Sequence, residues 1–223
     1  MPNPAPLIVF DCDGTLVDSQ YGIIAAMEAA FRAHNLENPT ARDIRRVVGL
    51  PLDAAIKQLL PPDASADLSH MVEVYRSASD ERRRLDADEE PMFPGVREVL
   101  AALASSGYSL GVATGKSRRG LQETLRRHDI ADYFQTLKSA DDGPGKPHPA
   151  ILQDAMAETG AVPHATVMIG DTTYDIQMAV NAGSLSIGVS WGYHGTDELS
   201  ATGANGIAQS FHDLPALIAD LCD

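Results

Sequence analysis

The sequence predicts an α/β protein with a doubly wound parallel sheet and an inserted all-helical unit. Several short, nearly continuous apolar runs have the length of strands, and amphipathic segments separate them along the chain. This alternation of strand and helix is typical of a parallel sheet covered by helices on both faces. One long interval, residues 18–90, interrupts the alternation because it contains amphipathic patterns alone.

The predicted strands are four apolar runs that each end in a polar residue. They lie at residues 7–11 (LIVFD), 108–114 (YSLGVAT), 165–171 (ATVMIGD) and 184–190 (SLSIGVS). The runs lack a clean apolar–polar alternation, which favours strands buried on both faces. We therefore expect these strands to form the centre of the sheet.

Helical patterns lie between the predicted strands, at residues 95–107, 117–129 and 174–183. Ser117 stands where an N-cap residue is expected, and Gly183 stands where a helix would end. The resulting order is that of a doubly wound sheet.

The interval after the first strand is predicted to be helical throughout. Its amphipathic segments are residues 21–35, 41–49, 52–60 and 68–84. The stretch at 86–95 (DADEEPMFPG), rich in acid, proline and glycine, is interpreted as the linker back to the sheet. We expect residues 1–17 and 91–223 to form the α/β core and residues 18–90 to form a helical cap.

Composition limits the class of protein and its partners. With 223 residues, 44% hydrophobic and 22% charged, the chain is expected to be a soluble globular protein with one core and a smaller appended unit. The net charge of −14 opposes binding to nucleic acid or to an anionic membrane. Cys12 and Cys222 cannot build a disulfide framework, and residues 1–10 lack the basic start of a secretory signal, so a cytoplasmic location is expected.

Polar residues gather where the predicted strands end. Ligands of open parallel sheets bind beyond the carboxyl ends of the strands, so residues far apart in sequence should meet there. Asp175 follows Asp171 by four positions and can point toward the same place. A loop at 143–149 (GPGKPHP) adds a lysine. The residues expected in this crevice are Asp11, Asp13, Thr114, Lys146, Asp171 and Asp175.

These residue types predict a site for phosphoryl transfer. Carboxylates so close together repel one another, and the pair Asp11 and Asp13 suggests a metal site, an acid/base pair, or both. An all-oxygen ligand set favours Mg²⁺. Thr114, followed by GKS at the start of a predicted helix, offers hydroxyl and N–H donors to phosphate oxygens.

Four motifs in this order resemble those of haloacid-dehalogenase-superfamily phosphatases, and the resemblance covers nearly the whole chain. The motifs are DCDGT at 11–15, Thr114 in VATGKS, Lys146 in GKPHP and GDTTYD at 170–175. The helical interval resembles the helical cap of that family. The segments FPGV, NAG and GVSWGY are similar to its phosphoglycolate-phosphatase-like branch.

The resemblance implies a role for each motif residue. Asp11 would be the nucleophile that forms an aspartyl-phosphate, and Asp13 would protonate the leaving oxygen and then activate the hydrolytic water. Thr114, Gly115 and Lys146 would bind the phosphate. Mg²⁺ would be held by Asp11, the backbone carbonyl of Asp13, and Asp171, with Asp175 assisting the metal or orienting Lys146.

Two further sets of residues leave alternatives open. The cations Arg42, Arg45, Arg46 and Lys57 of the predicted cap are either ordinary surface charge or, for Arg45 and Arg46, contacts to a distal anion of the substrate. Cys12 is interpreted as a small buried residue, because no arginine follows at the spacing that a thiol phosphatase needs.

The sequence therefore predicts a Mg²⁺-dependent phosphatase acting on a small phosphorylated metabolite, with phosphoglycolate as the leading candidate. The alternatives are a phosphosugar mutase of the β-phosphoglucomutase type and a pyrophosphatase. A phospho-switch module would share the strand-end aspartates and the lysine, but it would lack the helical insertion and the GDTTYD motif. The oligomeric state is left open.

Overall fold

The computed structural model describes residues 5–85 and 90–222. Residues 86–89 of the predicted return linker thus lie outside the described part of the chain.

A six-stranded parallel sheet forms the centre of the molecule, with strand order β3-β2-β1-β4-β5-β6. Its strands are β1 Leu7–Phe10, β2 Ser109–Ala113, β3 Thr136–Lys138, β4 Thr166–Gly170, β5 Leu185–Val189 and β6 Gly206–Ala208. The first strand lies in the middle, where Val9 is in register with Gly111 of β2 and with Met168 of β4. The predicted fold class and the four predicted strands are confirmed.

The edge strands β3 and β6 are absent from the sequence prediction. Each has three residues, which is too short for a run that hydrophobicity alone would reveal. The polar residues of β3 are nevertheless inside: Thr136 and Lys138 are both buried, and both bond to Glu158.

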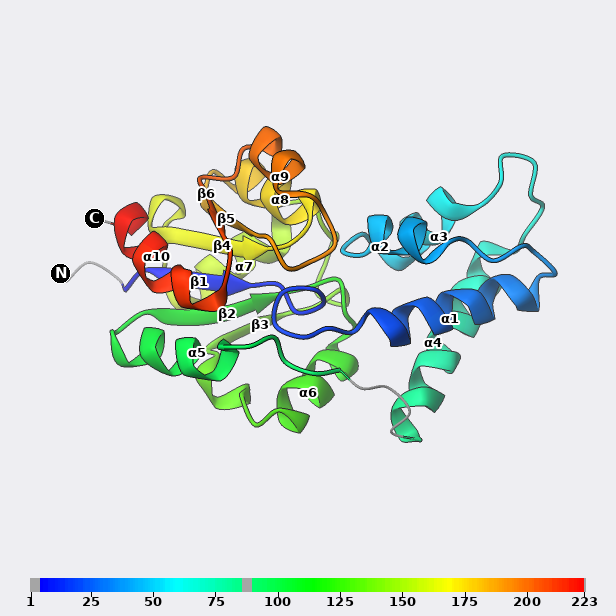
Figure 1. Ribbon diagram of the computed structural model, residues 1–223, viewed down its shortest axis with the longest axis horizontal. Coiled ribbons are helices and arrows are strands. Elements are labelled where there is room, and N and C mark those ends of the chain that lie inside the picture. The colour runs from blue at the N-terminus through cyan, green and yellow to red at the C-terminus, as the bar shows by residue number, and fades with distance from the viewer. Residues whose placement is uncertain (1–4, 86–89, 223) are drawn as a thin grey trace.

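Alternate residues of a strand point to opposite sides of the sheet, so both faces carry apolar side chains. Helices cover each of the two faces. On one face, Ile8 and Phe10 of β1 pack with α5 (Val96–Ser105), α6 (Arg118–Arg127) and α10 (Leu214–Cys222). On the other face, Leu7 and Val9 pack with α7 (Ala150–Thr159) and α8 (Thr173–Ala182). A short helix, α9 (Thr196–Thr202), packs against α8 and β5 (Figure 1).

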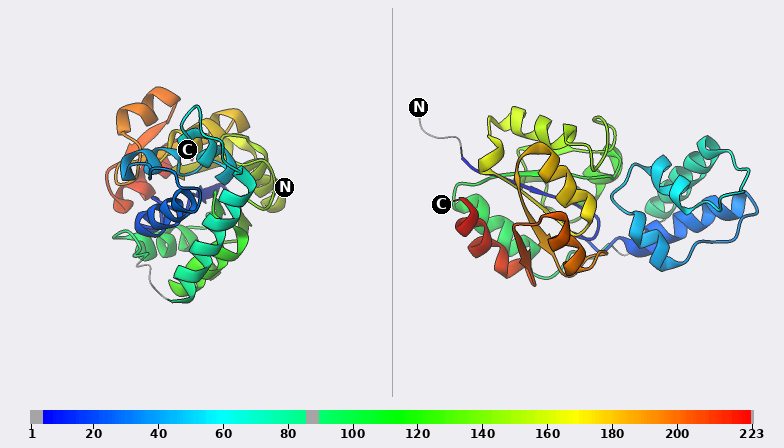
Figure 2. Two further views of the ribbon diagram at one scale, coloured as in Figure 1. Left: turned by 90° about the vertical axis from the view of Figure 1, so that its right-hand side faces the viewer. Right: turned by 90° about the horizontal axis from the view of Figure 1, so that it is seen from above.

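The described part of the chain between β1 and α5 forms helices that lie beyond the carboxyl ends of the strands (Figures 1 and 2). Its helices are α1 Gln20–Ala33, α2 Ala41–Val47, α3 Leu52–Leu59 and α4 Leu68–Arg84. They share an apolar cluster of their own, which includes Met27, Phe31, Ile44, Ile56 and Met71. The residue numbers that divide core from cap remain a prediction.

Side chains cap several of the helices. Thr40 accepts a hydrogen bond from the backbone N–H of Asp43 at the start of α2, and Ser117, the predicted N-cap of α6, accepts one from Gly120. Gly183 ends α8 in the left-handed conformation, as the sequence predicts.

Across the described residues, none of the helices is both long enough and apolar enough to cross a membrane.

Replacing Phe31 with alanine should destabilise the helical unit. Phe31 is 1% exposed in the cluster of that unit, so the change removes a buried ring and leaves a cavity that costs about 3–5 kcal/mol. Urea unfolding and hydrogen exchange of α1 and α4 measure the effect. Tyr21→Ala on the same helix is the control, because Tyr21 is 66% exposed. Equal losses for the two variants would contradict a packed helical core.

Candidate active site

The loop after β1 places two aspartates at the centre of the sheet edge. The backbone N–H of Asp11 donates to the Ile169 carbonyl of β4 at 2.8 Å, and the chain then turns so that the N–H of Leu16 donates to the Cys12 carbonyl at 2.9 Å. Cys12 is fully buried among apolar side chains, as predicted. The turn leaves both Asp11 and Asp13 facing the helical unit, where they line a common cavity.

Gly14 is required at this turn for two reasons. Its φ of 84° lies in the left-handed region, and a Cβ at this position would collide with the carboxylate of Asp171. The close approach brings the loop after β1 directly against the loop after β4.

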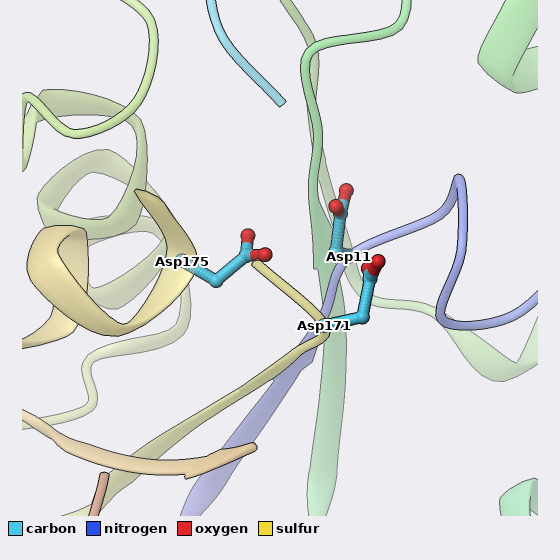
Figure 3. Close-up of side chains that lie close together, drawn as sticks. All are labelled: Asp11, Asp171 and Asp175. Atoms are coloured by element: carbon cyan, nitrogen blue, oxygen red, sulfur yellow. The ribbon is translucent and has the colours of Figure 1, made fainter. Parts of the chain in front are cut away.

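Three carboxylates meet at the strand ends (Figure 3). Asp11 follows β1, Asp171 follows β4, and Asp175 lies in the first turn of α8; all three are buried, and one oxygen from each lies within 4.8 Å of the others. Figure 3 shows the side chains turned toward a shared space. The strand-end positions in the sequence predict that these residues meet, and the structure brings them together.

Hydrogen bonds fix the orientation of two of these carboxylates. Asp171 accepts from the Thr15 hydroxyl at 2.8 Å and from the backbone N–H of Tyr193 at 2.9 Å. Asp175 accepts from the N–H and the hydroxyl of Thr172, at 3.0 and 2.7 Å, which makes a capping box at the start of α8. One oxygen of Asp175 thus caps the helix while the other faces the cluster.

Lys146 supplies the positive charge beneath the cluster. Its Nζ lies 2.8 Å from Asp11 Oδ1 and 2.5 Å from Asp175 Oδ1, and the side chain is fully buried. The loop that carries it is tied to α8, because Asn181 Nδ2 donates to the Pro147 carbonyl at 2.9 Å. The predicted lysine therefore bridges two of the predicted aspartates.

One lysine does not neutralise three buried carboxylates. Burial raises the pKa of Asp11 to about 7, although the charge of Lys146 opposes the shift. Burial, followed by the charges of Asp175 and Asp11, raises the pKa of Asp171 well above its usual range. Burial alone would lower the pKa of Lys146, but the negative charges of Asp11 and Asp175 raise it above its usual range. A buried all-oxygen donor set with surplus negative charge fits a hard divalent cation such as Mg²⁺.

Asp13 is held apart from the three clustered carboxylates. Its Oδ1 accepts from the Ser19 hydroxyl at 2.6 Å and from Lys116 Nζ at 2.7 Å. Lys116 also lies 3.2 Å from Glu90 Oε1, and the other oxygen of Glu90 accepts from Thr124. Burial alone would raise the pKa of Asp13, but Lys116 and Ser19 lower it. Asp13 is thus kept ionised at the border of the cavity.

The loop after β2 supplies hydrogen-bond donors next to the aspartates. Thr114 is buried, and its hydroxyl accepts from the backbone N–H of Lys116 at 3.2 Å. Gly115 passes close to the loop after α2, since a Cβ on Gly115 would lie 3.3 Å from the Gly49 carbonyl. Both Thr114 and Gly115 line the same cavity as Asp11 and Asp13.

This cavity has a volume of about 370 Å³ and lies between the strand ends and the helical unit. Its floor carries Asp11, Asp13 and Thr114, and its opposite wall comes from α1, α4 and the chain around α2 and α3. Lys146, Asp171 and Asp175 are fully buried beneath the floor.

Arg45 and Arg46, for which the sequence left open surface charge or a contact to a distal anion of the substrate, do not line the cavity. Ile44 and Val47 form the buried side of α2 and line the cavity, so the two arginines between them face away from it. Arg45 donates to the Gln20 side chain at 2.9 Å, and Arg46 pairs with Glu198 at 2.5 Å. Arg42 and Lys57 are exposed. The cations that line the cavity are Arg76, Arg83, Lys116 and Arg119.

Arg46 instead connects α2 to the α/β core. Its carbonyl oxygen accepts from the Tyr174 hydroxyl at 3.1 Å and lies 3.2 Å from His194 Nε2. The N–H of Thr173 donates to His194 Nδ1 at 3.1 Å, which places the imidazole proton on Nε2, where it can donate to Arg46. Burial and the Arg46 charge lower the pKa of His194 and favour this neutral form.

Sequence reasoning missed Lys116 and Glu90 as parts of the site. Lys116 lies two positions after Thr114, so its place in the loop after β2 was the available signal. Glu90 lies in the predicted linker, where no pattern distinguishes it from its acidic neighbours. Ser19 directly precedes α1, and its hydroxyl donates to Asp13.

Comparison with known proteins places this geometry among hydrolases. The family model described as haloacid dehalogenase-like hydrolase matches residues 8–189. A probable phosphatase, IndB, from Dickeya dadantii (strain 3937) is 38% identical, with 94% of this chain and 91% of that protein covered. A phosphoglycolate phosphatase from Salmonella choleraesuis (strain SC-B67) is 33% identical over the same shares. The structure of a haloacid dehalogenase-like family hydrolase from Streptococcus pneumoniae is 27% identical, covers 95% of this chain and 97% of its own, and has a TM-score of 0.83.

Replacing Gly14 with alanine should destabilise the protein more than the same change at Gly107. Both glycines have φ values in the left-handed region, at 84° and 88°, so both changes add backbone strain of roughly 1–2 kcal/mol. A Cβ at Gly107 meets nothing within 4 Å, whereas one at Gly14 meets Asp171. Thermal unfolding of the two variants measures the difference. Equal losses would show that the loop tolerates a Cβ beside Asp171.

Proposed function

Because the chain belongs to the haloacid dehalogenase-like hydrolase family and is a phosphoric monoester hydrolase, we propose that it is a Mg²⁺-dependent phosphatase that acts through an aspartyl-phosphate on Asp11. The observation that carries this proposal is the position of Asp11. Its carboxylate lies at the floor of a cavity, 2.8 Å from a buried lysine and beside two further buried carboxylates.

The proposed metal ligands are Asp11, Asp171 and the backbone carbonyl of Asp13, with Asp175 assisting or orienting Lys146. When bound, Mg²⁺ supplies positive charge that offsets the carboxylates and the phosphate oxygens. Thr15 and the backbone N–H of Tyr193 hold Asp171 for this task through the two hydrogen bonds described above.

Asp11 is the proposed nucleophile. One of its oxygens forms the bond to phosphorus as the ester P–O bond breaks, which transfers the phosphoryl group to the enzyme. Lys146, the Thr114 hydroxyl and the backbone N–H of Gly115 would bind the phosphate oxygens and stabilise the charge on them. Lys146 also positions the attacking carboxylate through its ion pair.

Asp13 is the proposed acid and base. Because Asp13 is ionised in the free protein, it would first take up a proton from solvent as the substrate binds, and it would then give this proton to the leaving oxygen in the first step. In the second step it would take a proton from the water that attacks the phosphoryl group on Asp11. Lys116 and Ser19 favour the ionised carboxylate, which is the form that accepts the proton of that water.

The identity of the substrate is a separate part of the proposal. Phosphoglycolate is the leading candidate from the sequence, and relatives from Salmonella and Vibrio vulnificus carry the name phosphoglycolate phosphatase. A mutase would differ in the acceptor of the phosphoryl group, and a pyrophosphatase would differ in the leaving group; both alternatives remain predictions. The cytoplasmic location and the expected lack of nucleic-acid and membrane partners also remain predictions.

Removal of Mg²⁺ should abolish turnover. Hydrolysis of p-nitrophenyl phosphate should stop in EDTA and return with added Mg²⁺, because the three carboxylates cannot be neutralised by Lys146 alone. Asp171→Asn should weaken Mg²⁺ binding in calorimetry, while Asp63→Asn, a change at an exposed residue, should not. Full turnover in metal-free buffer would disprove the metal assignment.

Replacing Asp13 with asparagine should affect alkyl and aryl esters differently. An alkoxide must be protonated as it leaves, so an alkyl phosphate should lose roughly 10²–10⁴ in the first step, the usual contribution of general acid catalysis. Nitrophenolate leaves unaided, so rapid-quench kinetics should show a burst of nitrophenol stoichiometric with enzyme and then slow turnover.

Asp11→Asn serves as the comparison, because it should remove the burst and the turnover together. Equal losses on both ester types without a burst in Asp13→Asn would assign the acid/base role to another residue.

A further inference from the structure

We propose that the cavity above Asp11 selects a phosphate monoester of an uncharged alcohol with an apolar or aromatic body, in preference to a short phosphorylated acid such as phosphoglycolate. This inference rests on the proposed function, because it takes the phosphate to lie at Asp11. It differs from the leading candidate substrate, and the reason lies in the wall that faces the aspartates.

The size of the cavity exceeds what a two-carbon acid needs. Its volume of about 370 Å³ falls in the range of roughly 300–1,000 Å³ that is typical of pockets for drug-sized ligands. With the phosphate at the floor, most of this volume remains for the alcohol part of the ester.

Part of the wall opposite the aspartates is apolar. It is formed by side chains of α1, α2 and α4, namely Ile23, Met27, Ile44, Val47 and Val72. Ile23 and Val72 are only half-buried, so they keep surface that a ligand can cover. Tyr75 of α4 adds an aromatic ring to the same wall. Such a wall favours a ligand with an apolar or planar body.

The cationic side chains that line the cavity already form ion pairs with carboxylates, with one exception. Lys116 pairs with Asp13 and Glu90, and Arg119 pairs with Asp80 at 3.2 Å. Arg83 pairs with Asp80 and with Glu123. Each of these ion pairs would have to be given up before the cation could bind a second anion of the substrate.

The exception is Arg76, which has no ion pair within the described part of the chain and is exposed at the cavity. Two carboxylates that form no ion pair with another described residue, Asp53 and Asp141, line the cavity as well. They would repel a substrate carboxylate, which makes the cavity selective against a short acid that carries a carboxylate in addition to its phosphate. An uncharged body avoids this repulsion and gains from the apolar wall.

A series of alkyl phosphates with Mg²⁺ tests the proposal through turnover. Ethyl, butyl and hexyl phosphate release alkoxides of similar basicity, so differences in kcat/KM report how the alcohol part is bound. Each buried methylene is worth up to about fourfold, so hexyl phosphate should exceed ethyl phosphate by at least about tenfold. Phosphoglycolate should be a poorer substrate than butyl phosphate. Equal kcat/KM values for the three alkyl phosphates, with phosphoglycolate as the best substrate, would overturn the proposal.

Binding of phosphonates separates this proposal from the proposed activity. Calorimetry with Mg²⁺ should show that hexylphosphonate binds more tightly than butylphosphonate, and that 3-phosphonopropionate, which carries a carboxylate, binds more weakly than either. If this order is found while no ester is hydrolysed, the proposed activity fails and the assignment of the cavity stands. If esters are hydrolysed but 3-phosphonopropionate binds most tightly, the assignment fails and the activity stands.

Two variants on one helix test the wall itself. Val72→Thr replaces a methyl group with a hydroxyl at the cavity and should reduce the preference for hexyl over ethyl phosphate by about threefold. Val74→Thr is the matched control, because Val74 packs against the cluster of the helical unit and does not line the cavity. Equal effects of the two changes would show that the preference has another origin.

Arg76→Gln tests the competing account. We expect it to change the butyl phosphate to phosphoglycolate ratio by less than about threefold, since the proposal gives Arg76 no carboxylate to bind. A selective loss of about tenfold or more in kcat/KM for phosphoglycolate is the size expected for a charged hydrogen-bonded pair. Such a loss would identify Arg76 as the residue that binds a second anionic group of the substrate, and it would overturn the proposal.

Discussion

The repulsion among three buried carboxylates is the constraint on which the rest of the site depends. Asp11, Asp171 and Asp175 would not remain together in a low-dielectric setting without groups that hold and offset them. Lys146 offsets part of the charge, and the hydroxyls of Thr15 and Thr172 fix two of the carboxylates by hydrogen bonds. The remaining negative charge is what makes the cluster suited to a divalent cation.

The helical unit completes the site from above by a different kind of contact. It presents apolar side chains of α1, α2 and α4 to the cavity. One of its contacts with the core is made by the backbone carbonyl of Arg46, which lies within hydrogen-bond distance of the Tyr174 hydroxyl and of His194 Nε2. The strand ends therefore carry the clustered carboxylates, and the opposite wall adds apolar surface beside its ion-paired residues. This separation orients a ligand that has an anionic end and an uncharged body.

Sequence reasoning could predict the parts of this protein that repeat a local pattern. The buried strands β1, β2, β4 and β5 were recognisable because their apolar runs have no alternation, and the strand-end rule then placed Asp11 beside Asp171. The three-residue edge strands β3 and β6 are too short to carry such a pattern. The sequence could not choose between the two alternatives for Arg45 and Arg46, because the rotation of α2 is set by Ile44 and Val47, whose burial depends on tertiary packing. The contact of Lys116 with Glu90 joins segments whose meeting no local pattern indicates.

The central claim is that the carboxylate of Asp11 takes up the phosphoryl group, and mass spectrometry of acid-quenched protein tests it most directly. The protein is mixed with Mg²⁺ and a hydrolysed ester, quenched during turnover and digested, and the added phosphoryl mass is located by peptide mapping. The account predicts one phosphoryl group on the peptide that contains Asp11, and none in Asp11→Asn. Hydrolysis without a phosphorylated peptide, or a phosphoryl group on another residue, would contradict it.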